Sequence, residues 1–254
     1  MLLCEINRIT SHLLFMATNG MDLGAVSMMI YGWREREEVL RFFEKVTGLR
    51  MNHNYIRPGG VAADLPDGWK ADVERLLEII PPRLEEYDVL MTGQPIWRER
   101  LQGVGVLNAD EALALSATGP ILRSTGYAWD LRRDEPYLAY PEVDFDVIVG
   151  SYGDCYDRYA IRLNEIRESM RIVEQIIDRM PAGDYRIQDK KVTPVIIKTL
   201  GPGLHLHIIK IKRRAHAVHE IHWYPDSNKI ARFTADNDFA FTIPGDRRRI
   251  VGCL

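Results

Sequence analysis

The stretch YDRYAIRLNEIRESMRIVEQIIDRM (156–180) carries the clearest structural signal in the chain. Its large side chains recur at alternating spacings of four and three residues: Tyr159, Leu163, Ile166, Met170, Val173, Ile177 and Met180. This spacing places them on one face of a helix, as a stripe that packs against other helices. Pro181 ends the pattern and Gly183 follows it. The stretch therefore predicts a long core helix, and the rest of the fold is worked out around it.

A second apolar run lies near the N-terminus, where Asp22 is the only charged residue between Arg8 and Arg34. The run is long enough to cross a bilayer, which would make a single span of residues 9–33. Its threonines, serine, histidine, asparagine and glycines make it polar for a span and favour one or two helices buried in a core. Gly20 and Gly24 flank Asp22 and make a helix break plausible there.

Asp22 is the first candidate functional residue, because we expect its carboxylate to lie among apolar side chains. A buried carboxylate must be paired, hydrogen-bonded or protonated, since an isolated buried charge is very costly. One interpretation is an aspartate that caps a helix at the break. The other is an acid that faces a ligand or exchanges protons. The spacing alone leaves both open.

Further helices are predicted on both sides of the middle of the chain. Residues 33–44 have amphipathic spacing that ends at Gly48. Residues 69–80 form another helix that Pro81 and Pro82 end, with helical spacing resuming over 84–90. Residues 145–149 are a candidate short strand.

Composition excludes several classes of protein. The formal net charge of −3 over 254 residues gives no reason to expect nucleic-acid binding. The three cysteines, Cys4, Cys155 and Cys253, lie far apart, which fits a reducing compartment and provides no cysteine-based metal site. No phosphate-binding glycine loop, nucleophile elbow or HExxH motif is present in the sequence.

The last 60 residues differ from the rest. Residues 195–254 carry ten Lys/Arg and five Asp/Glu, a net charge of +5, whereas residues 1–194 carry 23 and 31, a net of −8. Residues 204–209 alternate like a strand. His216, His219 and His222 recur every three residues, but no acid or cysteine completes a metal site, and chance composition explains them better. We therefore expect two regions, a helical core over 1–194 and a basic, histidine-rich tail over 195–254.

Several motifs, in order along the chain, closely resemble one family, the D subunit of bacterial NADH-quinone oxidoreductase, which is the counterpart of the mitochondrial complex I 49 kDa subunit. The resemblance runs from residue 1 to about Pro194. The segments that carry it include CEINRITSHLL (4–14), GMDLGA (20–25), NYIRPGGVAADLP (54–66), GVGVLNADEALAL (103–115) and GDCYDRYAIR (153–162).

The resemblance implies a mainly α fold with minor β, with a helical core like that of the nickel–iron hydrogenase large subunit. It implies a peripheral subunit of the proton-translocating enzyme on the cytoplasmic side of the bacterial cell membrane. There the subunit would help to form the quinone-binding chamber with the subunit that carries the terminal iron–sulfur cluster and the membrane-arm subunit at the quinone entrance. Electrons would come from NADH through iron–sulfur clusters in partner subunits, and this chain alone would bind no cofactor and no metal.

The resemblance also implies site residues. Asp22 occupies the family motif whose acid lies below the quinone head group and is thought to couple quinone reduction to proton movement through a nearby histidine. Thr18, one helical turn earlier, matches a polar residue of the chamber. We therefore expect Asp22 to be catalytic, and Asp22 and Thr18 to belong to the quinone site.

The chain also departs from the family pattern. The family's quinone-binding histidine and tyrosine lie in an N-terminal portion that this chain lacks, and the sequence after Pro194 no longer resembles the family. We therefore expect a truncated protein that is inactive alone. Two alternatives stay open: a non-catalytic assembly or binding protein with a helical core and a basic tail, and a single-span membrane protein.

Overall fold

The computed structural model describes residues 1–57 and 59–187, together with five short strand segments between residues 206 and 251. The chain divides into two compact units. The first comprises Met1–His53 and Leu65–Ala182, and the second comprises Asn54–Asp64 and Gly183–Leu254. Each unit is described by itself.

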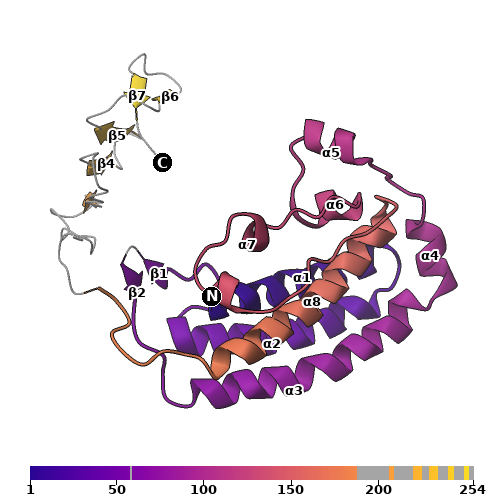
Figure 1. Ribbon diagram of the computed structural model, residues 1–254, viewed down its shortest axis with the longest axis horizontal. Coiled ribbons are helices and arrows are strands. Elements are labelled where there is room, and N and C mark those ends of the chain that lie inside the picture. Colours follow the sequence, from indigo (N-terminus) through magenta and orange to yellow (C-terminus); the bar gives the residue numbers. More distant parts are fainter. Residues whose placement is uncertain are drawn as a thin grey trace. The chain divides into compact units, whose positions relative to one another are not determined.

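Four long helices form the first unit: α1 (Leu2–Asp22), α2 (Ser27–Thr47), α3 (Trp69–Tyr87) and α8 (Cys155–Ile177). Helix α1 packs against α2 and α8, and α3 packs against the same two helices (Figure 1). The predicted stripe of α8 is confirmed, because Tyr159, Leu163, Ile166, Met170 and Val173 are all buried. Gly48 ends α2 with a positive φ of 79°, as its position predicted.

Helices α1 and α2 approach each other closely through glycine. A Cβ atom on Gly32 of α2 would lie 2.8 Å from the Cβ of Ala17 and 2.9 Å from the carbonyl oxygen of Leu13. A Cβ on Gly20 of α1 would lie 2.6 Å from the Cβ of Met28. Only glycine leaves room at these two positions, so the distance between the two helices depends on them.

Helix α3 continues through Pro81 and Pro82, and the prediction that these prolines end the helix was wrong. Each proline removes one backbone hydrogen bond. Both lie toward the outer side of α3, where water can bind the carbonyl groups left unpaired. The buried stripe of the helix runs unbroken across them, through Val73, Leu76, Ile80, Leu84 and Tyr87, and this packing outweighs the local effect of proline.

Short elements complete the first unit. They are η1 (Asp88–Thr92), α4 (Pro95–Leu101), α5 (Ala109–Ala114), α6 (Gly119–Ser124), α7 (Leu131–Asp134) and η2 (Tyr140–Glu142). Asn108 and Glu111 cap the start of α5 reciprocally, side chain to backbone. The strand predicted over 145–149 is absent, since these described residues have no regular structure. Hydrogen bonds from Gln175 and Glu168 of α8 to the backbone of Asp144 and Asp146 hold this stretch instead.

The second unit contains the β structure. Strands β1 (Ile56–Arg57) and β2 (Gly60–Val61) form a hairpin, and Val61 N donates to Tyr185 O at 3.1 Å. An antiparallel sheet joins β3 (Leu206–Ile208), β4 (Glu220–Tyr224) and β5 (Lys229–Phe233), and β6 (Ala240–Thr242) pairs with β7 (Arg249–Val251). The strand predicted over 204–209 is thus present at 206–208. The predicted boundary at Pro194 lies outside the described residues.

The predicted fold class, mainly α with minor β, is confirmed. Within the described residues, no helix combines the length and the apolar character that a membrane crossing requires.

Candidate functional site

The turn between α1 and α2 carries the residues that the sequence singled out. Helix α1 ends at Asp22, so the predicted break is confirmed. Two backbone hydrogen bonds close the turn, from Ala25 N to Gly20 O at 2.8 Å and from Gly24 N to Met21 O at 3.0 Å. Arg100 of α4 donates to the carbonyl oxygen of Leu23. The turn is therefore fixed both by its own backbone and by α4.

Asp22 itself is exposed, and the expectation that it is buried was wrong. The break falls at Asp22 and puts its side chain at the helix end rather than within the packed part of α1. Its carboxylate has no hydrogen bond and no ion pair within the described part of the chain. A negative charge at the C-terminal end of a helix is also disfavoured by the helix dipole. Folding therefore gains nothing from this carboxylate, which leaves it free for another role.

Thr18 lies one turn before Asp22, about 6 Å along the helix axis. It is half-buried, and its hydroxyl donates to the carbonyl oxygen of Leu14 at 3.0 Å. The structure thus places both predicted residues near the same end of α1. Their assignment to a quinone site stays a prediction.

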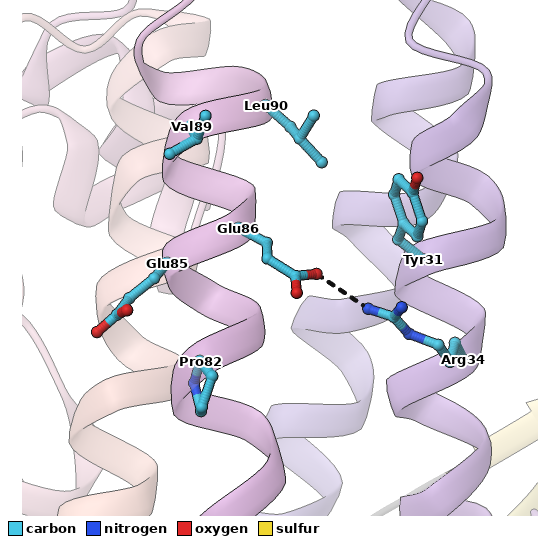
Figure 2. A pocket seen from close by; sticks show the side chains of 7 residues that line it. All are labelled: Tyr31, Arg34, Pro82, Glu85, Glu86, Val89 and Leu90. Carbon is cyan, nitrogen blue, oxygen red and sulfur yellow. Dashed lines mark hydrogen bonds and ion pairs between the residues drawn. The ribbon is translucent and has the colours of Figure 1, made fainter.

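An open groove lies between α2 and the α3–η1 segment (Figure 2). Its volume is about 590 Å³. Leu90 and Tyr31 extend into it from facing helices, and an ion pair of 3.1 Å joins Glu86 to Arg34 across it. The residues that line the groove are Tyr31, Arg34, Pro82, Glu85, Glu86, Val89 and Leu90.

Large apolar side chains are exposed on and beside this groove. Val26 and Ile30, one turn apart on α2, are 65% and 71% exposed, and Val89 is 70% exposed. Leu90 adds to the same surface. These four residues are called the apolar end of the bundle below. Asp22 lies only four residues before Val26, so an exposed acid and an exposed apolar surface occur on the same helix turn.

Behind this end, the interface between α1 and α8 is polar, which the sequence did not reveal. His12 Nε2 lies 2.7 Å from Glu165 Oε2, and Arg123 Nε donates to Glu165 Oε1 at 2.9 Å. Arg123 also donates to the carbonyl oxygen of Trp129 at 3.0 Å. His12, Glu165 and Arg123, here called the His12 cluster, are all buried.

The His12 cluster holds a neutral histidine beside a charged pair. Burial lowers the pKa of His12 below its usual 6.5, although the hydrogen bond and the charge of Glu165 oppose this. Burial would raise the pKa of Glu165, but the hydrogen bond from His12 and the charge of Arg123 outweigh it and lower that pKa. At neutral pH, His12 therefore donates its Nε2 proton to an ionised Glu165.

A second polar group lies farther along the same interface. Glu5 of α1 accepts hydrogen bonds from Ser169 at 2.7 Å and from Tyr140 at 2.5 Å, and Arg132 Nη1 lies 3.2 Å from each carboxylate oxygen. Asp130 holds the other side of Arg132 at 2.7 Å. Burial, and then the charge of Glu5, raise the pKa of Tyr140. Every polar group in the set therefore has a partner, as a buried polar cluster requires.

The sequence held a signal for these residues. Glu5 and His12 are seven residues apart on α1, and Glu165 and Ser169 are four apart on α8, so each pair shares one helix face. Both faces are otherwise apolar, and polar residues on a packed face must be paired. The search for periodic apolar residues passed over them.

No group of three or more metal-ligating side chains occurs within the described residues. Of the three regularly spaced histidines in the tail, His222 lies in strand β4 rather than on a helix. His216 and His219 lie outside the described residues.

Comparison with known proteins identifies similar sequences over most of the chain. The family model for the 49 kDa subunit of respiratory-chain NADH dehydrogenase matches residues 22–221, and so runs past Pro194 into the stretch expected to diverge. The D subunit of NADH-quinone oxidoreductase from Acidothermus cellulolyticus is 52% identical over 201 residues, which cover 79% of this chain and 46% of that protein.

Two further relatives give the same result. The D 1 subunit of the same type of enzyme from Salinispora arenicola is 53% identical over 75% of this chain and 43% of that protein. The D subunit from Mycolicibacterium smegmatis is 52% identical over 84% of this chain and 49% of that protein. The chain thus spans less than half the length of these relatives.

Proposed function

Because the chain belongs to the 49 kDa subunit family of respiratory-chain NADH dehydrogenase, we propose that it forms part of the quinone-binding chamber of a proton-translocating NADH-quinone oxidoreductase. The observation that carries the proposal is the placement of Asp22. It is an exposed, unpaired acid on the turn that leads directly into the exposed apolar end of the bundle.

This combination suits quinone chemistry. Reduction of a quinone to a quinol takes up two electrons and two protons, so the site needs a group that can supply or relay protons. The head group and its hydrocarbon tail also need an apolar surface, which Val26, Ile30, Val89 and Leu90 offer. Thr18 adds a hydroxyl one turn away from Asp22.

In this proposal the electrons come from NADH through iron–sulfur clusters that partner subunits hold. The partners are the subunit with the terminal cluster and the membrane-arm subunit at the quinone entrance, and the complex lies on the cytoplasmic side of the cell membrane. The exposed apolar end supports contact with such partners, because a patch of this kind marks an interaction surface or a binding groove.

The test replaces Asp22 by asparagine in a full-length protein of this family that contains residues 1–194 of this chain, expressed in a strain that lacks its own copy of the subunit. We expect quinone reduction by NADH in membrane vesicles to fall at least about ten-fold, because the proton-exchanging group is lost. The amount of assembled complex and the reduction of ferricyanide, which needs no quinone site, should not change.

The matched control is Asp110→Asn, which removes an equally exposed acid from α5. It should leave quinone reduction unchanged. Equal quinone turnover in Asp22→Asn and Asp110→Asn would remove Asp22 from the proposed site.

A further inference from the structure

Arg36 of α2 is buried, yet its guanidinium is largely unpaired. The residue is only 7% exposed, and neither Nε nor Nη1 has a hydrogen-bond acceptor in the described part of the chain. Nη2 contacts only the sulfur of Met51, at 3.5 Å. A buried charge without a partner is strongly unfavourable, so such a group calls for an anion that is not yet present.

The acids around Arg36 cannot fill this role, because each already has a cationic partner. Glu35 pairs with Arg34, and Glu37 forms two parallel hydrogen bonds with Arg50, of 2.8 and 2.6 Å. Glu38 pairs with Arg41 at 2.9 Å and with Arg75 at 2.8 Å. Burial, and then the nearby charge of Arg50, lower the pKa of Arg36, as expected for a cation that lacks a counter-ion.

The surroundings of Arg36 indicate the chemistry of the missing partner. Its guanidinium lies 4.6 Å over the ring of Trp33, which covers one face. Trp33, Leu49 and Met51 are exposed apolar side chains around it, and the last two are about half exposed. An arginine within such an apolar rim is typical of an energetically dominant contact between proteins. Met51 is unbranched and flexible, so it can move aside as a carboxylate enters.

We propose that Arg36 is the anchor of a protein-binding surface and receives a carboxylate side chain, flanked by apolar residues, from a partner polypeptide. The carboxylate accepts hydrogen bonds from Nε and from Nη1, and the flanking residues cover Trp33, Leu49 and Met51. This surface is separate from Asp22, and the inference does not rest on the quinone proposal.

The test follows the Nε–H signal of Arg36 in nitrogen–proton correlation spectra of the 254-residue chain. The signal is identified by its loss in Arg36→Lys. The probes are the blocked peptide N-acetyl-Leu-Glu-Leu-amide, the same peptide with glutamine in place of glutamate, and sodium acetate, with sodium chloride matched for ionic strength. We expect the glutamate peptide to move the signal in a saturable manner, at least ten times more tightly than acetate, and the glutamine peptide to leave it in place.

Two results would overturn the proposal. No movement with any probe would show that Arg36 is satisfied within the chain. Equal affinity for acetate and for the glutamate peptide would show a site for a free small anion rather than for a polypeptide.

A second measurement uses thermal stability. Arg36→Met removes an unpaired buried charge, so its melting temperature should equal or exceed that of the unchanged chain. Arg41→Met is the control, since Arg41 is exposed on the same helix and has its own partners. A fall of more than about 3 °C in Arg36→Met alone would show that the arginine already has a stabilising partner inside the chain.

Discussion

At the scale of single residues, the buried charges between α1 and α8 matter most for stability. Replacing Glu165 by glutamine removes the partner of Arg123, which stays buried. We expect the free energy of unfolding to fall by about 3–5 kcal/mol, as for other buried pairs that lose one member. Urea unfolding measures the change. Glu174→Gln, an exposed acid on the same helix, should change it by less than about 0.5 kcal/mol. Similar losses in both variants would contradict a special role for the pair.

The same cluster predicts a dependence on pH. The pKa of His12 is lower in the folded chain than its usual 6.5, so the unfolded chain binds the proton more readily. Stability from this residue is therefore complete above the unfolded value and declines as the pH falls below it. The lowered pKa of Glu165 adds a loss in the same direction at more acidic pH.

We therefore expect the melting temperature to fall between pH 7 and pH 5, and His12→Gln to reduce that fall, because glutamine can still donate to Glu165 but does not titrate. Melting curves over this pH range test it. An unchanged slope in the variant would assign the pH dependence to other groups.

Sequence reasoning identified which residues to examine better than it identified their environment. The break at Asp22 followed from its flanking glycines, which act locally. Its burial could not be deduced, because exposure depends on what packs around the helix end. His12 and Glu165 escaped notice because they are 153 residues apart, and only the folded chain brings them together.

At the scale of secondary-structure elements, the close contact of α1 with α2 is the most sensitive feature. In Gly32→Ala, the new methyl group would collide with Ala17 and with the backbone of Leu13. The added carbon improves helix propensity by about 1 kcal/mol but overpacks the interface by about 1–3 kcal/mol. We expect a net loss of about 1 kcal/mol in chemical denaturation.

The matched control is Gly93→Ala, just after η1, where a Cβ atom would make only an ordinary contact, 3.6 Å from the carbonyl oxygen of Asp88. It should not destabilise the chain. If Gly32→Ala proved as stable as Gly93→Ala, the two helices would have room to separate.

The helices themselves were largely predictable, because apolar periodicity is a local property of the sequence. Helix α8 follows its stripe closely, and α2 ends at Gly48 as predicted. Helix α3 shows the limit of local rules. Two consecutive prolines argue for a helix end, yet the buried stripe on the opposite side keeps the helix continuous, and the strength of that packing is known only from the tertiary structure.

At the scale of the whole molecule, the apolar end should make the isolated chain self-associate. Exposed apolar surface of this kind is removed from water when two copies meet. We expect the double variant Ile30→Lys, Val89→Lys to be more monomeric in light scattering after size-exclusion chromatography. Leu115→Lys, at an equally exposed leucine just after α5, is the control. Equal association in all three proteins would place the contact elsewhere.

The division of the chain into units was only partly predictable. The shift in charge near Pro194 indicated a second region, but nothing in the composition of residues 54–64 separates them from the helices around them. Backbone hydrogen bonds from the segment around Tyr185 and Ile187 to the β1–β2 hairpin join them to the second unit. Such pairing involves no side-chain pattern that a sequence could display.

The pairing of His12 with Glu165 also sets an order of events during synthesis. About 150 residues must follow His12 out of the ribosome before its partner exists, which takes about 10–30 s at ordinary rates of translation. Throughout that time α1 exposes a polar stripe that it must later bury, together with the apolar residues around it. The bundle can therefore close only after α8 has been made, and until then the nascent helix is a natural client for a chaperone.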